Sequence, residues 1–160
     1  MTAYAIIENR DKPFNELFGD DGEAIQQDII FSSQVHSSQR LPEGKWEYRR
    51  YANGAVALVC ADTRSKIPVE TNAGEVLLVS PEALSLSANL MVMHEKAHDH
   101  GQIKRSLCVM HQALHEAIIR DIPTILITST TPEVETRKPN GREVRVIPHE
   151  EAQSIVLLAC

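Results

Sequence analysis

The stretch from Ser80 to Pro123 constrains the fold most, because it has the pattern of two consecutive helices. Ser80 is a good N-cap and Pro81 suits the first helical turn. Apolar residues then recur every three or four positions up to Gly101, and the same spacing returns until Asp121, just before Pro123. The recurring residues are Ala83, Leu86, Leu90, Met93 and Ala97, followed by Ile103, Leu107, Met110, Leu114 and Ala117. The sequence therefore predicts a helical hairpin.

A β-hairpin is predicted around Asn53-Gly54, the pair that best tolerates the positive φ angles of a tight turn. Strand-type residues lie on both sides of it, and either Arg49 or Arg50 is expected to be exposed. Short connections between the predicted strands favour antiparallel pairing. The flanking strand residues are Trp46, Tyr48, Val56, Leu58 and Cys60, and further strands are predicted at Tyr4–Ile7, Val69–Thr71 and Glu75–Val79.

The remaining segments predict smaller elements. Residues 14–31 favour a short helix interrupted by a turn at Gly19–Gly22, and residues 32–44, which include His36, favour a surface connection. We expect three strands after the helical hairpin, at Thr124–Thr128, Glu143–Ile147 and Ser154–Leu158. The predicted fold is α+β: an antiparallel meander packed against a helical hairpin, with an extra C-terminal β segment.

Composition limits the class of protein. A chain of 160 residues with 42% hydrophobic content fits a single domain spanning 1–160. A net charge of −6 disfavours direct binding to nucleic acid. The cysteines Cys60, Cys108 and Cys160 are widely spaced and are predicted to be free thiols. No signal region or membrane-spanning run is apparent, so we expect a cytoplasmic protein without membrane contact.

The sequence His94-Glu95-Lys96-Ala97-His98 fits the HExxH pattern, in which two histidines one helical turn apart bind zinc and the glutamate activates water. In the extended metzincin pattern a third histidine would stand at Lys104, and a cation is a poor metal ligand. Lys96 and Asp99 are also charged, which does not suit a helix buried beneath a cleft.

We therefore expect a protein with no metal, no cofactor and no catalytic residue, with the histidines forming a polar flank beside the apolar face. The alternative is a small zinc-dependent hydrolase or peptidase, with His94 and His98 as ligands and Glu95 as general base. Either His111 or His115 of the second helix would complete that site.

The order of several short motifs resembles the ArdB/KlcA antirestriction family over residues 10–123. These motifs are Phe14 with Phe18-Gly19, Gly44, Trp46-x-Tyr48, Asn53-Gly54, Ser80-Pro81-Glu82-Ala83, and a last helix from Leu114 to Pro123. The chain departs from the family at three places. Ala55 replaces a second turn glycine, and the Gly-Gly pair before the tryptophan is reduced to Gly44. Residues 124–160 have no counterpart in the family. These last residues are expected to be a C-terminal β extension of the single domain.

The resemblance implies an α+β inhibitor, encoded on a plasmid or phage, that protects incoming DNA from type I restriction enzymes without mimicking DNA. It supplies no catalytic residues. The expected partner is a host defence protein, with a type I restriction enzyme as the specific target. Exposed aromatic and arginine side chains dominate many protein interfaces, so Trp46, Tyr48, Arg50 and Asn53 are the candidate partner-binding residues. The sequence leaves the oligomeric state open.

Overall fold

The computed structural model describes residues 4–38, 41, 45–62, 65–98, 104–119, 124–125, 135–137, 144–146 and 149–159. The helices are α1 (Pro13–Phe18), α2 (Gly22–His36), α3 (Pro81–Ala97), α4 (Arg105–Ile119) and α5 (Ala152–Ala159), with short 3₁₀ helices η1 (Asn9–Asp11) and η2 (Gly19–Asp21). The strands are β1 (Tyr4–Ile7), β2 (Trp46–Tyr51), β3 (Val56–Cys60), β4 (Ile67–Glu70), β5 (Val76–Val79), β6 (Thr124–Ile125), β7 (Glu135–Arg137) and β8 (Val144–Val146).

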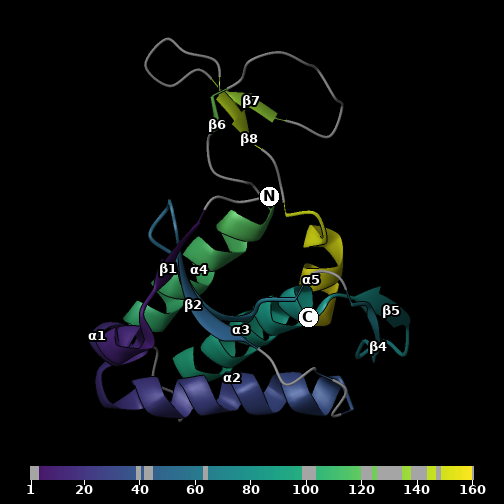
Figure 1. Cartoon of the computed structure of the whole chain (residues 1–160), viewed down its shortest axis with the longest axis horizontal. Coiled ribbons are helices and arrows are strands. Elements are labelled where there is room, and N and C mark those ends of the chain that lie inside the picture. The colour runs from purple at the N-terminus through teal and green to yellow at the C-terminus, as the bar shows by residue number, and fades with distance from the viewer. Residues whose placement is uncertain are drawn as a thin grey trace.

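The helix α3 lies at the centre of the molecule, where α2, α4, α5 and β3 pack against it (Figure 1). Ser80 caps its start by accepting a hydrogen bond from the Ala83 amide, as the sequence predicts. Every residue from Pro81 to Leu90 is buried, so this part of the helix is covered on all sides and not on one face alone. Its small uncharged residues Ser85, Ser87 and Asn89 make this close packing possible.

The main sheet has the strand order β1-β2-β3 and is antiparallel, as predicted. The β2–β3 turn contains Asn53 and Gly54, whose φ of 88° is easily adopted only without a β-carbon. Tyr48 of β2 pairs with Leu58 of β3 and with Ile7 of β1. The strand β1 therefore lies at an edge, which confirms the prediction for Tyr4–Ile7.

The other edge of this sheet is covered by helix side chains. The Leu58 amide donates to Oδ1 of Asn89 at 3.0 Å, and Nδ2 of Asn89 donates to the Leu58 carbonyl at 2.7 Å. The Cys60 amide donates to Oγ of Ser85 at 3.0 Å, and the Val56 amide faces Sδ of Met110 at 3.1 Å. Side chains of α3 and α4 thus occupy positions that a further strand would take, and within the part of the chain that the structure describes β1 is the open edge.

Several sequence predictions need correction. Residues Ser154–Leu158 lie in the helix α5 and not in a strand, and Ile155 and Leu158 of this helix are buried in the core. The apolar run was too short to distinguish a buried helix from a strand. The helix α2 continues to His36, beyond the predicted limit, so His36 is helical. The predicted strands β4 and β5 form a separate two-stranded sheet and do not extend the β1–β3 sheet.

Other predictions are confirmed. The chain is α+β, α3 and α4 pack together as a helical pair, and a break separates α1 from α2. At Gly22 a β-carbon would lie 2.6 Å from the Phe14 carbonyl oxygen, so the two helices can approach this closely only with glycine there. The strands β6, β8 and β7 form a small antiparallel sheet. Two of its strands, β6 and β8, lie within the strands predicted at Thr124–Thr128 and Glu143–Ile147. Cys60 and Cys108 are free thiols.

No helix in the described part of the chain is both long enough and apolar enough to cross a bilayer. Several positions that the sequence analysis used lie outside the described residues: Gly44, Asp99, Gly101, Ile103, Asp121, Pro123 and Cys160.

Candidate functional site

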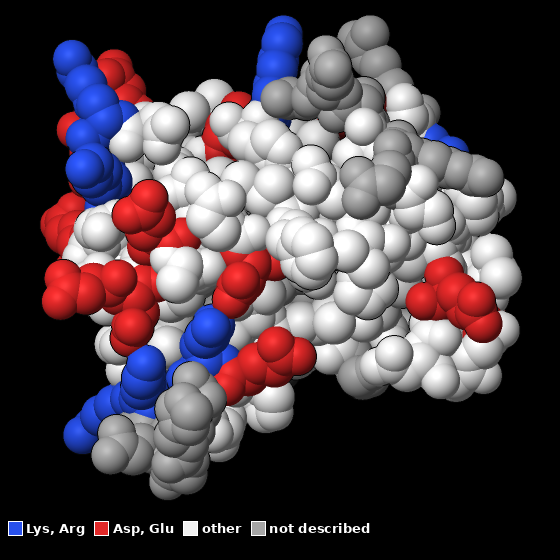
Figure 2. Space-filling model, turned by 90° about the horizontal axis from the view of Figure 1, so that it is seen from below, with Lys and Arg blue, Asp and Glu red and all other residues white. Residues whose placement is uncertain are grey.

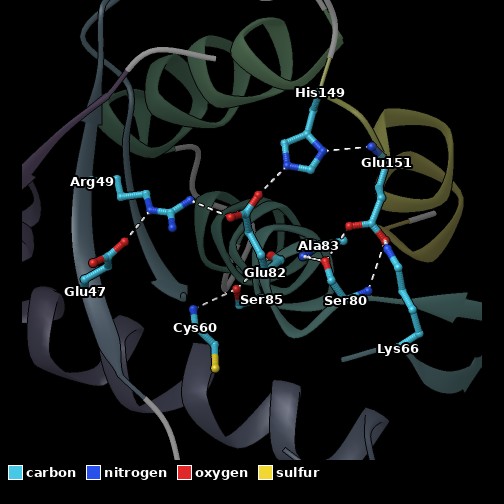
Figure 3. Close-up of polar contacts among 10 residues, drawn as sticks. All are labelled: Glu47, Arg49, Cys60, Lys66, Ser80, Glu82, Ala83, Ser85, His149 and Glu151. Atoms are coloured by element: carbon cyan, nitrogen blue, oxygen red, sulfur yellow. Dashed lines mark hydrogen bonds and ion pairs between the residues drawn. The ribbon is translucent and has the colours of Figure 1, made fainter. Parts of the chain in front are cut away.

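A buried ionic network joins β2, the start of α3 and the segment before α5 (Figure 3). Nη1 of Arg49 lies 3.0 Å from Oε2 of Glu82, and Nε of Arg49 lies 2.7 Å from Oε1 of Glu47. Nε2 of His149 lies 2.6 Å from Oε1 of Glu82. Arg49, Glu82 and His149 are 3%, 1% and 7% exposed, so the carboxylate of Glu82 is satisfied from two sides inside the protein.

The hydrogen bonds assign the tautomer of His149. The Glu151 amide donates to Nδ1 of His149 at 2.9 Å, so that nitrogen carries no proton. Nε2 carries the proton and donates it to Glu82. Both ring nitrogens of a neutral imidazole are therefore engaged, and His149 has no free nitrogen with which to act as a base on a substrate.

A second group of contacts holds the first turn of α3 to α5. The Ser80 hydroxyl donates to Oε2 of Glu151, and the Ser80 amide donates to Oε1 of the same side chain at 3.0 Å. Nζ of Lys66 lies 2.8 Å from Oε1 of Glu151. Glu151 thus ties β4, the N-cap of α3 and the start of α5 together.

These contacts change the acidity of both carboxyl groups. Burial alone raises the pKa of Glu82, but the hydrogen bond from His149 and the charge of Arg49 outweigh burial and hold the pKa below its ordinary value. For Glu151, burial likewise acts to raise the pKa, and the hydrogen bonds from Lys66 and Ser80 lower it overall. Burial raises the pKa of Tyr51, which neighbours Arg49, to about 12. Both carboxyl groups are therefore ionised at neutral pH.

Sequence reasoning missed this network. His149 lies 67 residues beyond Glu82, so no local pattern marks the two residues as partners. The sequence does contain one indication of a buried ion pair: Glu82 is the only Asp, Glu, Lys or Arg of α3 before Glu95. Because its members satisfy one another, we assign the network a structural role.

The structure brings four histidines into a row on α3 and α4. The ring centroids of His94 and His98 are 4.7 Å apart, those of His94 and His111 are 5.7 Å apart, and those of His111 and His115 are 6.4 Å apart. Partial burial and the neighbouring histidines lower the pKa of His111. His94, Glu95 and His98 are exposed, whereas His111 and His115 are half-buried. As placed, no three His, Cys, Asp or Glu residues of the described chain have the arrangement of a metal site.

The four candidate partner-binding residues have different environments. Tyr48 is 3% exposed and packs edge-on against Phe14, with ring centroids 5.1 Å apart. Asn53 stabilises the turn, because its Nδ2 donates to the Ala113 carbonyl at 2.7 Å and its Oδ1 accepts from the Ala55 amide. Trp46 is half-buried and Arg50 is exposed. Asn53 is also exposed, so Tyr48 is the one of the four candidates that the fold keeps from reaching another molecule.

Two shallow clefts flank the edge strand β1. The first, of about 260 Å³, lies between α2 and the β1–β2 pair, and Ile6, Ile30 and Trp46 contribute to it. The second, of about 400 Å³, is lined mainly by Tyr4, Arg50 and residues at the β2–β3 turn. We call β1 and these two clefts the β1 edge surface. Ile6 projects from it and is 64% exposed.

Figure 2 shows the face of the molecule on which α2 lies, and charge is unevenly distributed there. Acidic side chains are most numerous at the left, at the α1 and η2 end, where basic side chains are also present. Further acidic groups lie below the centre and at the right, and the middle is largely uncharged. The exposed acidic residues of this end are Asp11, Glu16, Asp20, Asp21 and Glu23. Phe31 of α2 is 66% exposed.

Comparison with known proteins gives one structural likeness. The chain matches no protein-family model and no curated protein, whereas three solved chains resemble it. One comes from work reporting that the KlcA and ArdB proteins show a novel fold and antirestriction activity against type I DNA restriction systems in vivo but not in vitro. The likeness has a TM-score of 0.59 at 15% identity and covers 71% of this chain and 82% of the other.

The fold thus defines this chain as an α+β protein of the architecture seen in that work. The chain is structurally similar to the protein described in the KlcA and ArdB work, and the order of its sequence motifs agrees with that similarity.

Proposed function

We propose that this protein is an antirestriction inhibitor that acts on a type I restriction system by contact with a host protein. The observation that carries the proposal is the structural likeness to the KlcA and ArdB work, which extends over 71% of the chain. Such an inhibitor, encoded on a plasmid or phage, would protect unmodified DNA from cleavage when that DNA enters a cell with a type I restriction system.

The surface chemistry supports contact with protein in preference to DNA mimicry. A mimic of the DNA backbone needs closely spaced negative charge along an extended surface, because DNA carries one charge per roughly 1.7 Å of its axis. Here the net charge is −6 over 160 residues, and on the face in Figure 2 the acidic side chains are mixed with basic ones and separated by an uncharged middle.

We propose the β1 edge surface as the contact region. An open strand edge offers unpaired backbone amides and carbonyls to a partner strand, and neighbouring clefts accept side chains. Trp46 and Arg50 belong to the residue types that contribute most to binding energy. Of the two edges of the β1–β3 sheet, β1 is the one along which no helix side chain of the described residues is bonded.

The test is phage plating in cells, because the related antirestriction activity was reported in vivo but not in vitro. Unmodified phage is plated on a host with a type I restriction system, with and without expression of this protein. We expect expression to raise plating efficiency on the restricting host and to have no effect on an isogenic host without restriction. Unchanged plating, with the protein shown to be present and folded, would contradict the proposal.

A further inference from the structure

We propose that β1 binds an extended segment of the partner protein in which an acidic residue stands between two apolar residues. The segment adds to the β1–β3 sheet as a fourth strand, and its acidic side chain pairs with Arg50. The inference rests on the proposed function, because it describes the chemistry of the partner at the β1 edge surface.

The hydrogen bonds of the sheet show which backbone groups of β1 are open. The Leu58 amide and carbonyl bond to Asn89, so both point away from β2. Opposite residues of an antiparallel pair alternate between exchanging two hydrogen bonds and exchanging none. Tyr48, which lies opposite Leu58, therefore directs its own amide and carbonyl at Ile7 of β1. The preceding residue, Ile6, directs both groups at the open edge.

Ile6 is thus the residue at which a partner strand can form a complete pair of hydrogen bonds. In the described part of the chain its amide and carbonyl have no other hydrogen-bond partner. The same alternation directs the groups of Tyr4 at this edge, whereas the Glu8 carbonyl accepts from the Asp11 amide at 3.1 Å. A partner segment therefore pairs with Tyr4 and Ile6, and one of its residues lies opposite Ala5.

The position opposite Ala5 is where Arg50 favours a negative charge. Ala5 lies directly opposite Arg50, and both side chains are exposed. Opposite residues share a face of the sheet, so only the methyl group of Ala5 separates Arg50 from the partner residue. With strands about 4.8 Å apart, the two α-carbons are about 10 Å apart, a distance that arginine and glutamate side chains span together. Such a pair forms charge-assisted hydrogen bonds.

Arg50 is available for this contact. Its neighbour Arg49 is buried and bonded to Glu47 and Glu82. Arg50, in contrast, forms no ion pair with any residue that the structure describes. As placed, it lines the cleft of about 400 Å³ beside Tyr4, whose other lining residues are tyrosine, alanine and glycine. A cation at the side of an apolar cleft favours a carboxylate next to an apolar side chain.

The two residues that flank the acidic one lie opposite Tyr4 and Ile6, on the other face of the sheet. Ile6 is 64% exposed, and Tyr4 is half-buried against Tyr51, with ring centroids 6.0 Å apart. Aromatic and β-branched side chains stabilise one another when they pair across strands. The flanking residues of the partner segment are therefore apolar.

The geometry disfavours a second copy of this chain as the occupant. Because Tyr4 and Ile6 carry the open groups, two antiparallel β1 strands pair even-numbered residues with even-numbered ones. Ala5 then lies opposite Ala5 or Ile7 of the second copy and not opposite Glu8. In each of these registers Arg50 would face an uncharged side chain.

The test is fluorescence anisotropy of two labelled peptides with the unmodified full-length protein. The first probe is Ser-Gly-Thr-Ile-Glu-Ile-Thr-Gly-Ser, and the second has lysine in place of glutamate. Each sequence is the same in both directions, so the result does not depend on the direction of the added strand. We expect the glutamate peptide to bind at least about fivefold more tightly, because lysine would repel Arg50.

Charge reversal at Arg50 gives the sharper measurement. R50E should bind the lysine peptide at least about fivefold more tightly than the glutamate peptide. The matched control is R105E, which makes the same change of charge at an exposed arginine of α4. R105E should keep the preference for glutamate.

Substitutions of Ile6 test the backbone pairing. I6P should bind neither peptide, because proline lacks the amide that pairs with the partner and is tolerated on an edge strand. I6V keeps the amide and should bind like the unmodified protein. Absence of saturable binding, or equal binding of both peptides by the unmodified protein, would overturn the inference. A dimer in sedimentation analysis that I6P dissociates would also overturn it, since a second copy would then occupy the edge.

Phage plating separates this inference from the proposed function. We expect R50E to lose protection and R105E to keep it. If the unmodified protein protects and R50E protects equally well, the antirestriction function stands and the acidic segment is wrong.

Discussion

Nη1 of Arg49 and Oε2 of Glu82 lie 3.0 Å apart in the interior, with their side chains 3% and 1% exposed. Arg49 comes from the middle strand of the sheet and Glu82 from the first turn of the central helix. Removing one member of such a pair leaves the other charge buried without its partner, which costs more than replacing both. This asymmetry makes the pair a sensitive test of the network.

We expect R49M to lower the free energy of unfolding by about 3–5 kcal/mol, because Glu82 would lose the cation that compensates its charge. Urea denaturation at neutral pH, followed by circular dichroism, measures the change. The control is the double variant R49M/E82L, which removes both charges and should be more stable than R49M alone. If the two variants were equally unstable, lost packing and not an unpaired charge would explain the effect.

Acid should destabilise the protein through Glu82 and Glu151. Both carboxyl groups have a pKa below the ordinary value of 4.5 in the folded state, so the folded protein binds fewer protons than the unfolded chain in acid. Their stabilising contribution is therefore complete above about pH 4.5 and is lost as the pH falls through the lower folded-state values. Denaturation midpoints measured across this range should fall more steeply for the unmodified protein than for E82Q.

The covered edge of β3 depends on Asn89, so N89A should be clearly destabilising. It would remove the partners of the Leu58 amide and carbonyl, both in the core, and an unsatisfied buried group costs about 1–3 kcal/mol. The matched control is S87A, because the buried Ser87 hydroxyl donates only to the Leu84 carbonyl of its own helix. An N89A variant no less stable than S87A would show that the β3 edge does not need its side-chain cover.

The β1 edge surface can be tested with two matched substitutions. Ile6 and Val76 are 64% and 63% exposed, and both lie on strands. I6K and V76K should each change stability by no more than about 0.5 kcal/mol. In the phage-plating assay we expect I6K to lose protection and V76K to keep it. Equal protection by the two variants would exclude Ile6 from the contact region.

The hydrolase alternative makes the opposite prediction for Glu95. An HExxH hydrolase loses its general base in E95Q and should become inactive. We expect E95Q to protect phage as well as the unmodified protein does, because Glu95 lies outside the β1 edge surface. Loss of protection in a folded E95Q variant would favour the enzymatic alternative and would argue against inhibition by contact alone.

Local signals in the sequence were sufficient to predict most of the central elements. The N-cap at Ser80, the Asn53-Gly54 turn and the spacing of apolar residues predicted the helical pair and the hairpin, and the structure confirms both. These features depend on residues within a few positions of one another. The failure at Ser154–Leu158 has the same origin, since a short apolar run fits either a strand or a buried helix.

Contacts between distant segments could not be predicted in this way. The bond between His149 and Glu82 joins residues 67 positions apart, and no local pattern marks either as a partner of the other. The sequence also suggested a single meander, whereas Ser85 and Asn89 cover β3 and end the sheet there. The histidine row was foreseeable only in part, because the alignment of α3 with α4 depends on packing between the two helices.

The His149 amide donates to the Ile118 carbonyl at 2.7 Å, so the two ends of the intervening segment meet at its base. In Figure 1 the small β6–β8 sheet of this segment projects from the side of the molecule where α4 ends and α5 begins. Closing a chain over such a base costs free energy that grows only with the logarithm of its length. A change in the length of this segment should therefore have little effect on the stability of the rest of the fold.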